Sequence, residues 1–330
     1  MERRVLGTTG ADVSVVGIGT WQLGADWGRV DEGEAGRVLA AALDSGVTFI
    51  DTADVYGDGR SERIVGRFLR EHAGAGLFVA TKMGRRVAQD PANYTPDAFR
   101  AWNDRSRENL GVDTLDLVQL HCPPTEVLQS PTTWETLREM VDEGRIRAFG
   151  ASVETCDQAV LAMDGGAATV QIILNVFRRK PLEEVLPRAR RLGVGIVARV
   201  PLASGLLSGR YRHDTVFAPD DHRAYNRDGS SFDVGETFAG VPFDVGVDAA
   251  REFSALCEEL GPAGATPAQV ALRWVVDREG VTTVIPGARS PEQARANAAS
   301  GDLPALSPEL DRALADLYDR RIRAHVHHRW

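Results

Sequence analysis

The sequence predicts an α/β fold in which all 330 residues, 1–330, form one (β/α)8 TIM barrel domain. Short runs rich in valine, isoleucine and leucine alternate with longer amphipathic segments, as in repeated strand–helix units. The short runs are almost continuously apolar, which is typical of parallel strands buried on both faces. Eight such runs are enough to close a barrel, and they cover residues 15–19, 47–51, 77–81, 115–121, 147–152, 169–173, 195–200 and 282–286.

Helix-start signals stand between the expected strands. Thr132 and Thr266 are each followed, three residues later, by a glutamate or a glutamine, which is the spacing of a capping box. The pair Ser307-Pro308 places proline in the first turn of a further helix, where its missing N–H costs nothing. A doubly wound open sheet is the alternative, but it calls for a glycine-rich fingerprint after the first strand. The segment GIGTWQLG offers only a loose G-x-G, so the barrel is favoured.

Three parts of the chain fall outside the repeat. Residues 3–6 and 13–16 flank a glycine-containing turn and predict an N-terminal β-hairpin. Residues 203–246 follow the seventh strand, and they are long for a loop in a compact domain. Their many aromatic side chains favour a folded lid. Residues 307–330 are expected to form a C-terminal helix and a tail that folds back over one end.

Composition and charge exclude several functional classes. The net charge is −9, from 47 acidic and 38 basic residues, which argues against nucleic acid and membranes as partners. The first residues carry no apolar signal segment, and no apolar run approaches the length of a membrane helix. Three cysteines without a C-x-x-C pair indicate a reducing compartment. We therefore expect a cytoplasmic protein with a small-molecule substrate, either as a monomer or as a homo-oligomer.

Four side chains that can transfer a proton or hold a charge lie at or just past three successive strand ends: Asp51, Tyr56, Lys82 and His121. The carboxyl ends of barrel strands form one rim, and catalytic residues of such barrels gather there. Asp51 and Lys82 end neighbouring strands and are expected to form a partly buried ion pair. An ammonium group beside Tyr56 would stabilise the phenolate and lower the pKa of the phenol. The four residues thus predict an acid–base site in which Tyr56 gives up the proton.

Each of these residues also has an ordinary structural interpretation. Asp51 and Lys82 can form a structural ion pair, Tyr56 can be a turn residue, and His121 can cap a strand. Lys82 can alternatively form a Schiff base, as in an aldolase or lyase. A neighbouring carboxylate argues against that chemistry because it keeps the lysine charged. Spacing alone leaves these alternatives open.

Longer motifs resemble the aldo-keto reductase family over about residues 3–325. The resemblance implies a (β/α)8 barrel and reduction of a carbonyl by hydride from a bound nicotinamide. It also implies that Tyr56 donates the proton, that Asp51 and Lys82 lower its pKa, and that His121 orients the substrate. The matching segments occur in the family's order, each at a strand end: GIGTWQLG, FIDTADVYGDGRSE, ATKMG, DLVQLHCPP, AFGASVE, VQIILN, VPLASGLLSGR and IPGARSPEQARAN.

The same resemblance implies which residues hold the cofactor. Two side chains match the positions that bind the nicotinamide carboxamide, Ser152 and Gln171. The loop along the pyrophosphate corresponds to Pro201, Leu202, Ser204, Gly205 and Leu207. The adenosine end corresponds to Arg289, Ser290, Gln293 and Asn297. Further cofactor contacts are implied for Gly19, Thr20, Trp21, Asp51, Arg199, Ile285 and Gly287.

The adenosine end also has a physical interpretation. Ser290 starts a helix whose free backbone N–H groups and dipole favour an anion. Arg289 adds a positive charge that suits a ribose 2′-phosphate. NADP(H) is therefore expected as the cofactor rather than NAD. The alternative is that Ser290 and Gln293 merely cap the helix while Arg289 is solvated.

Three positions depart from the family's pattern. Cys122 stands where many relatives carry tryptophan, which predicts a roomier wall beside the catalytic centre. Val153 replaces an asparagine that contacts the carboxamide in many relatives. Arg199 stands where an aromatic ring often stacks on the nicotinamide. A guanidinium stacked there predicts a preference for the reduced over the oxidised cofactor, because two positive charges repel.

The substrate pocket is expected at the same rim. Trp21 and Trp27 follow the first strand and are expected to line the pocket. Aromatic residues of the lid either line it or anchor the lid: Phe217, Tyr225, Phe232 and Phe238. The predicted substrate contacts are Trp21, Tyr56, His121 and Cys122. The histidines near the C-terminus have no carboxylate or cysteine at ligand spacing, so no metal site is expected.

Together these observations predict an NADPH-dependent oxidoreductase that reduces the carbonyl of an aldehyde, ketone or keto sugar to an alcohol. Two alternatives stay open. One is a cofactor-binding regulatory subunit with slow turnover. The other is a Schiff-base lyase or aldolase that uses Lys82.

Overall fold

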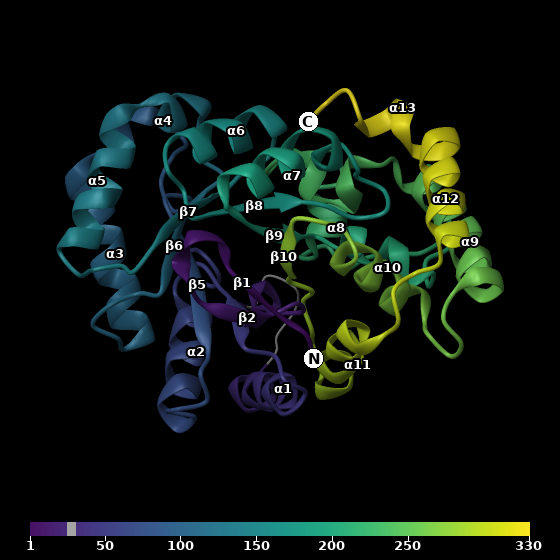
Figure 1. The fold of residues 1–330 in the computed structure, drawn as a ribbon, viewed down its shortest axis with the longest axis horizontal. Coiled ribbons are helices and arrows are strands. Elements are labelled where there is room, and N and C mark those ends of the chain that lie inside the picture. Colours follow the sequence, from purple (N-terminus) through teal and green to yellow (C-terminus); the bar gives the residue numbers. More distant parts are fainter. Residues whose placement is uncertain (25–30) are drawn as a thin grey trace.

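A computed structural model of the protein describes residues 1–24 and 31–330. Trp27, which the sequence placed in the substrate pocket, lies outside these residues. Within them, eight strands form one parallel sheet in the order β10-β9-β8-β7-β6-β5-β4-β3. Bridges from Val16 to Val284 and from Gly19 to Gly287 join the first strand to the last. The sheet is thereby closed into the barrel that the sequence predicted (Figure 1).

The strands lie within the runs predicted from apolar periodicity, or extend them by at most two residues. Their bounds are β3 Ile18–Gly19, β4 Phe49–Asp51, β5 Phe78–Met83, β6 Leu117–His121, β7 Phe149–Ser152, β8 Thr169–Ile173, β9 Gly195–Arg199 and β10 Val281–Val284. Every residue of β4 and β6 through β10 is buried, which explains why these runs are almost entirely apolar. The few polar residues in them therefore mark positions where a side chain faces a special environment.

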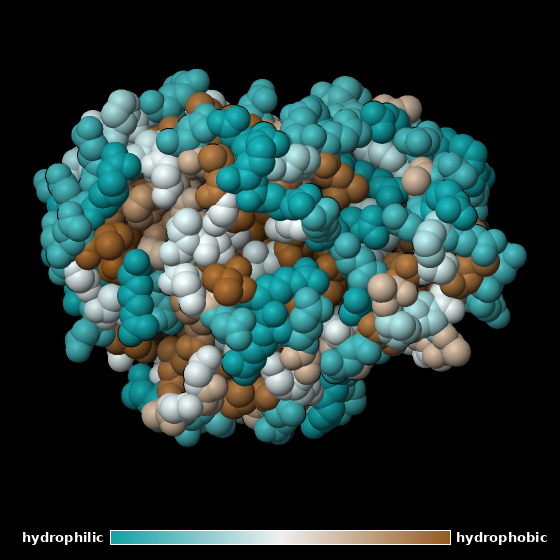
Figure 2. All heavy atoms as spheres, in the orientation of Figure 1, coloured by the Kyte–Doolittle hydropathy of each residue, from teal (hydrophilic) through white to brown (hydrophobic). Residues whose placement is uncertain are grey.

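The N-terminal hairpin covers the amino end of the barrel. Strands β1 (Arg3–Val5) and β2 (Asp12–Ser14) pair antiparallel around a turn that contains Gly7. A Cβ atom at Gly7 would lie 2.1 Å from the carbonyl oxygen of Ala168, so only glycine allows this approach. Figure 2 shows side chains covering the centre of the face on which the hairpin lies. The carboxyl ends of the strands, on the opposite side, are left for the functional groups.

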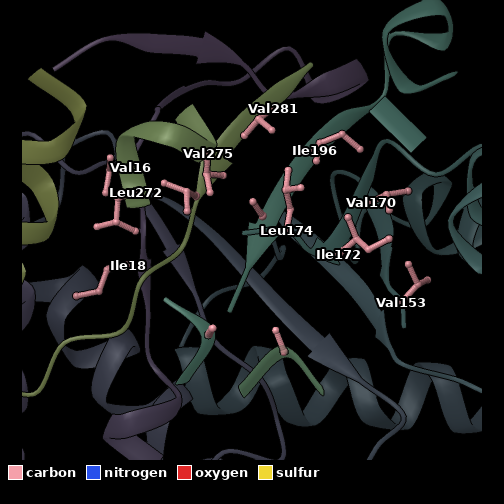
Figure 3. Close-up of a cluster of buried hydrophobic side chains, with 14 of the residues drawn as sticks. Val16, Ile18, Val153, Val170, Ile172, Leu174, Ile196, Leu272, Val275 and Val281 are labelled. Atoms are coloured by element: carbon pink, nitrogen blue, oxygen red, sulfur yellow. The ribbon is translucent and has the colours of Figure 1, made fainter. Parts of the chain in front are cut away.

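Helices surround the barrel and bury its outer face. Their bounds are α1 Glu32–Asp44, α2 Arg60–Glu71, α3 Pro96–Leu110, α4 Thr125–Gln129, α5 Pro131–Asp142, α6 Cys156–Asp164, α7 Pro181–Leu192, α8 His222–Tyr225, α9 Phe243–Leu260, α10 Pro267–Val276, α11 Pro291–Ala299, α12 Pro308–Leu317 and α13 Arg323–Val326. Leu272 and Val275 of α10 belong to the same buried cluster as Val16 and Ile172 of the barrel (Figure 3). This packing fixes the strand ends on which the site is built.

One helix start differs from the prediction. The Thr266 capping box is present and opens α10. Thr132, in contrast, does not cap a helix, because α5 already begins at Pro131 with Ser130 as its N-cap. Proline at the first helical position fixes the backbone for helix entry, so the helix starts before the predicted cap.

The segment 203–246 is folded, as its aromatic content predicted. It contains short helical turns and α8, and its last residues already belong to α9. Phe217 and Phe238 pack with Tyr211 and Phe243 in one cluster of rings, so these two lid aromatics anchor the segment. Phe232 instead lies against Trp21, with ring centroids 6.0 Å apart. Tyr225 packs on Phe232, with ring centroids 6.2 Å apart, and whether these two aromatics line the substrate site stays a prediction.

The C-terminal tail folds back onto this segment. Trp330, the last residue, is buried beside the guanidinium of Arg178, 3.8 Å from the ring centroid. Its indole N–H donates to Asp233 at 3.2 Å. Cβ atoms at Gly235 and Gly240 would lie 3.0 and 2.2 Å from its ring, so the two glycines make room for it. The tail therefore holds the part of the segment that contains Glu236.

No helix in the described part of the chain is long and apolar enough to cross a membrane.

Candidate active site

Asp51 and Lys82 meet inside the carboxyl end of the barrel. Asp51 is the last residue of β4, and Lys82 is the last but one of β5. Both side chains are almost fully buried, and the Lys82 Nζ atom lies 2.5 Å from Asp51 Oδ1. Nζ also donates to the Thr52 carbonyl oxygen at 2.8 Å and to the Tyr56 hydroxyl at 3.3 Å. The structure thus brings together the ammonium, the carboxylate and the phenol.

Two glycines let the backbone place Tyr56 over the barrel mouth. Gly57 has a φ of +58°, and a Cβ atom there would lie 2.0 Å from the Gly24 carbonyl oxygen. A Cβ atom at Gly24 would lie 2.8 Å from the Tyr56 backbone. The turn after β4 therefore packs directly on residues 21–24. As a result Trp21 stacks on the Tyr56 ring, with centroids 6.1 Å apart.

Two buried glutamines hold the other oxygen of Asp51. Gln171 on β8 donates to Asp51 Oδ2 at 2.8 Å, and Gln119 on β6 lies 3.4 Å from the same oxygen. Gln171 had been assigned to the nicotinamide carboxamide, and that role stays a prediction. Gln119 was missed, although one signal was available. It stands two residues before His121 in an apolar strand, so its side chain faces the same interior.

The pKa of Tyr56 moves in the direction opposite to the sequence-based expectation. Burial raises the pKa of its phenol, and the charge of Lys82 opposes this without reversing it, because Asp51 and Glu236 add negative charge. Burial alone would lower the pKa of Lys82, but the charges of Asp51 and Tyr56 raise it. The prediction of an unusually acidic phenol was therefore wrong. Tyr56 is a protonated phenol beside a charged lysine.

His121 completes the group at the end of β6. It is buried, and its ring lies edge-on to Tyr56 with centroids 5.9 Å apart. Burial, followed by the positive charges of Arg85, Lys82 and Arg199, holds the pKa of His121 well below its usual value. The ring is neutral at physiological pH and can donate one hydrogen bond from one nitrogen.

A second cluster of charges borders His121, and we call it the ionic wall. It consists of Arg85, Glu154, Arg199 and Glu236, which come from four separate segments. Arg85 pairs with Glu236 at 2.8 Å, Arg199 pairs with Glu154 at 2.9 Å, and Arg199 reaches Glu236 at 3.8 Å. Arg85, Glu154 and Glu236 were missed from the sequence. Arg85 follows Lys82 by three residues, which was the available signal.

The two carboxyl groups of the ionic wall differ in protonation. Burial raises the pKa of Glu154 to about 7, with the charge of Glu236 adding to the rise and that of Arg199 opposing it. Burial would also raise the pKa of Glu236, but Arg85 and Arg199 lower it to about 2. Cys122, Glu154 and Glu236 lie close enough together to hold a metal ion. Two guanidinium groups already supply the positive charge that such a cluster needs.

A model of the Aldo/keto reductase family matches residues 15–318. The chain belongs to this family. Aldo-keto reductase YhdN of Bacillus subtilis (strain 168) is 33% identical over 311 residues, which cover 90% of this chain and 87% of the relative. The glycerol dehydrogenase AKR11B4 from Gluconobacter oxydans is 31% identical and has a TM-score of 0.78, covering 97% of this chain and 95% of its own. An aldo-keto reductase from Klebsiella pneumoniae in complex with NADPH is 27% identical and has a TM-score of 0.70, covering 96% of both chains.

The family assignment confirms the resemblance drawn from the motifs. This aldo/keto reductase is an oxidoreductase with the family's barrel. The roles of individual residues stay predictions, but their positions can be compared with the geometry. Ser152 ends β7, paired in register with His121, and its hydroxyl lies 3.7 Å from Cys122 Sγ. The Cys122 backbone has a φ of 49°, which non-glycine residues adopt rarely and mainly at functional sites.

Arg199 has partners that the sequence did not predict. Besides the two carboxylates of the ionic wall, it donates to the Val153 carbonyl oxygen at 3.2 Å. Only about 8% of the residue is exposed. A guanidinium held by this many acceptors is fixed in the wall. Its stacking on a nicotinamide ring, and the cofactor preference drawn from it, stay predictions.

The loop predicted to run along the pyrophosphate is tightly turned. Val200, Ala203, Ser204 and Gly205 all have positive φ. Left-handed backbone in three non-glycine residues is costly and typical of ligand-binding loops. Ser204 accepts the Phe238 N–H at 3.1 Å and donates to the Glu236 carbonyl oxygen at 3.1 Å. Ser204 therefore ties the loop to the ionic wall. The other predicted loop residues, on the same turn, are Pro201, Leu202 and Leu207.

The helix α11 begins after Ser290, as the sequence predicted, and its first residues show the capping that the sequence offered as the alternative. Ser290 caps the helix by accepting the Gln293 N–H at 3.3 Å, and Gln293 Oε1 accepts the Arg289 N–H at 2.8 Å. Asn297 donates to the Gly287 carbonyl oxygen at 3.1 Å. The side chains of Ser290 and Gln293 thus cap the helix here. The exposed guanidinium of Arg289 has no ion pair within residues 1–24 and 31–330.

The ends of the first and last barrel strands lie between the catalytic residues and the start of α11. Gly19 donates to the Pro286 carbonyl oxygen at 3.0 Å. The Thr20 hydroxyl donates to the Asp51 carbonyl oxygen at 2.9 Å, and Ile285 is buried beside them. The predicted contacts therefore lie along the rim from the catalytic group towards Arg289. Two surface hollows of about 410 and 590 Å³ lie elsewhere, beside Leu69 and beside the hairpin.

Proposed function

We propose that this aldo/keto reductase is an NADPH-dependent enzyme that reduces the carbonyl of an aldehyde, ketone or keto sugar to an alcohol. Tyr56 is the proton donor in this proposal. The observation that carries it is the contact of the Tyr56 hydroxyl with the buried Lys82 ammonium at 3.3 Å. A protonated phenol beside a fixed positive charge is suited to giving up a proton as negative charge develops on a carbonyl oxygen.

Each residue of the group has a defined task in this chemistry. The carbonyl oxygen binds between the Tyr56 hydroxyl and the neutral His121 ring. Tyr56 transfers its proton to that oxygen, and Lys82 stabilises the phenolate that is left. Asp51 keeps Lys82 charged, and Gln171 and Gln119 hold Asp51 in place. When bound, the reduced nicotinamide supplies the hydride.

The residues at the adenosine end fit NADP(H). Ser290 begins α11, whose dipole favours an anion at this end, and the exposed Arg289 has no ion pair among the described residues. Both favour a phosphate at this end of the rim. The similar Klebsiella pneumoniae structure contains NADPH, which supports the same cofactor here. Arg289 and Ser290 would hold the 2′-phosphate.

The Schiff-base alternative is less well supported. Imine formation needs a neutral amine, whereas Asp51 raises the pKa of Lys82 and keeps it protonated. The complete group of Tyr56, Lys82 and His121 also favours an enzyme over a regulatory subunit. A cytoplasmic location and the oligomeric state stay predictions.

The test is an oxidation assay with NADPH and with NADH against aldehydes, ketones, diketones and keto sugars, with the alcohol product identified. The expected result is alcohol formation with NADPH preferred. Consumption of NADPH without an alcohol product, or no consumption with any carbonyl, would contradict the proposal. Borohydride trapping tests the alternative directly, because labelling at Lys82 by a carbonyl compound would support an imine.

A further inference from the structure

Arg85 lies beside the catalytic histidine although nothing in the sequence pattern assigned it a role. It follows β5 after Gly84, whose φ of +102° turns the chain across the barrel mouth. A Cβ atom at Gly84 would lie 2.8 Å from the Tyr94 ring, so glycine is required there. The Arg85 Nη1 atom lies 3.5 Å from His121 Nε2 and 2.8 Å from Glu236 Oε1. Its guanidinium also lies over the Phe232 ring at 5.5 Å.

The environment of His121 determines which nitrogen carries its proton. His121 Nδ1 is buried and has no hydrogen-bond partner in the described structure. A proton on Nδ1 would make that nitrogen a buried hydrogen-bond donor without an acceptor. This costs more free energy than leaving Nδ1 as a buried acceptor without a donor. We therefore expect the proton on Nε2, which faces Arg85. Arginine can only donate, so the 3.5 Å contact between Arg85 Nη1 and His121 Nε2 is a hydrogen bond only when Nε2 carries no proton, and with Nε2 protonated two donors lie next to each other.

A pair of donors this close has room for oxygen acceptors from the substrate. An oxygen about 2.9 Å from each nitrogen satisfies the geometry of both donors. The carbonyl oxygen is expected between Tyr56 and His121, so Arg85 lies next to the carbon beside the carbonyl. Its Nε and Nη2 atoms are neither buried nor bonded among the described residues, and its side chain is 20% exposed. Arg85 thus keeps partly exposed donors that have no partner among the described residues.

The ion pair with Glu236 determines what charge the substrate can have. Glu236 is ionised, since Arg85 and Arg199 hold its pKa low against the effect of burial. The pair is therefore close to neutral, and a substrate carboxylate would meet the repulsion of Glu236. A neutral oxygen, such as a hydroxyl or a second carbonyl, accepts from Arg85 without that cost.

We propose that Arg85 is a substrate-binding residue that selects carbonyl compounds with a neutral oxygen on the adjacent carbon, such as α-hydroxyketones, α-hydroxyaldehydes and vicinal diketones. The proposal rests on the proposed reductase function and narrows its substrate class. In it, Arg85 donates to the adjacent oxygen while Tyr56 and His121 hold the carbonyl oxygen. The three donors then fix which face and which carbon of the substrate are presented.

The test compares two ketones of nearly equal size, hydroxyacetone and butanone, in which a hydroxyl replaces a methyl group. The native protein and Arg85→Met are assayed for kcat and KM with NADPH. Arg85→Met should lower kcat/KM for hydroxyacetone by roughly 10- to 100-fold, as expected for a hydrogen bond from a charged donor. The kcat/KM for butanone should stay within about threefold of the native value, because butanone has no hydroxyl for Arg85 to contact. The contact is therefore measured by how much the substitution changes the ratio of the two kcat/KM values. Arg85→Lys should recover part of the loss.

Arg86→Met is the matched control. Arg86 is the next residue, is exposed, and pairs with the exposed Asp58 at 2.7 Å, away from His121. Its substitution should leave the ratio of the two ketones unchanged. Calorimetric titration of the NADP-saturated protein with hydroxyacetone gives a readout without turnover, and Arg85→Met should weaken this binding by a similar factor.

The outcomes separate the two proposals. An unchanged ratio in Arg85→Met, with ketones still reduced, would overturn the role of Arg85 alone. An equal loss for both ketones would also overturn it, because the residue would then act on the fold or on catalysis in general. Failure of the native protein to reduce any carbonyl would overturn the reductase function itself and the selection that rests on it.

Discussion

The catalytic group and the ionic wall are adjacent but are built differently. Asp51, Lys82 and His121 stand on the ends of neighbouring strands, and hydrogen-bonded register fixes their spacing. The members of the wall come from the turn after β5, the loop after β7, the end of β9 and the long segment before α9. Both rest on ion pairs, but three members of the first stand on neighbouring strands of the sheet, whereas only Arg199 of the wall lies on a strand. Register therefore sets the spacing of Asp51, Lys82 and His121, while loops and turns place Tyr56 and most of the surroundings of the substrate.

This difference predicts where substitutions will act. Changes in the catalytic group should reduce turnover of every substrate, since each carbonyl needs the same proton. Changes in the ionic wall should alter the preference among substrates and reduce the overall rate less. Substitutions in each region can therefore confirm or break the distinction.

Among the residues that act through Tyr56, the largest effect is expected for Lys82→Met. Loss of the ammonium removes the charge that stabilises the Tyr56 phenolate, so kcat should fall roughly 10²- to 10⁴-fold for all carbonyls. Lys82 also opposes the rise of the Tyr56 pKa, so the pH at which activity declines should shift upward in the variant. Steady-state rates across pH measure both effects. A loss confined to some substrates would contradict the comparison.

Two further variants control this experiment. Lys180 is the only other lysine in the chain, and Lys180→Met should leave turnover and pH dependence unchanged. Removal of Lys82 leaves Asp51 buried without its partner, which typically costs about 3–5 kcal/mol of stability. The double variant Asp51→Asn with Lys82→Met avoids the unpaired charge. If the double variant is folded and as slow as the single variant, misfolding is not the cause.

Glu236→Gln should change substrate preference with a smaller effect on rate. The substitution leaves Arg85 as an unneutralised cation at the mouth of the barrel. The kcat/KM for a 2-oxo acid such as pyruvate should therefore rise relative to the kcat/KM for hydroxyacetone. A gain of about 10-fold in the ratio of kcat/KM values is expected for a charge-assisted contact. Glu154→Gln, which faces Arg199, should shift the ratio less. An unchanged ratio in Glu236→Gln would show that Glu236 does not control the charge accepted at the site.

Asp54→Asn should change stability and leave substrate preference unaltered. Burial, with the nearby charge of Glu62, raises the pKa of Asp54 to about 7. A carboxyl whose folded pKa exceeds its unfolded pKa contributes stability at low pH and loses it as the pH rises through the folded pKa. Relative to the native protein, the free energy of unfolding of the asparagine variant should therefore increase from pH 5 to pH 8. The difference should reach about 1–4 kcal/mol at pH 8.

Urea unfolding at the two pH values measures this gain. Asp58→Asn is the contrasting control, because hydrogen bonding by Arg86 and the charge of Arg105 lower the pKa of this exposed carboxyl. It should show no gain at pH 8. An Asp54→Asn gain that is equal at both pH values would exclude titration of Asp54 as the cause.

The sequence predicted most of the catalytic group because strand periodicity is local information. Apolar runs marked each strand, and polar residues at their ends marked Asp51, Lys82 and His121. The ionic wall was beyond this reasoning, because Glu154 and Glu236 meet only when two distant loops fold together. Arg199 was noticed, but its partners depended on those loops. The predicted direction of the Tyr56 pKa shift was wrong for a related reason, since burial is a property of the assembled site.

The central claim is that Tyr56 supplies the proton, and Tyr56→Phe tests it most directly. The measurement is the single-turnover rate of NADPH oxidation with the best carbonyl substrate, together with the affinity for NADPH. The account predicts a rate at least about 10³-fold lower than that of the native protein, with NADPH affinity within about threefold. A variant that reduces the carbonyl at close to the native rate would contradict it.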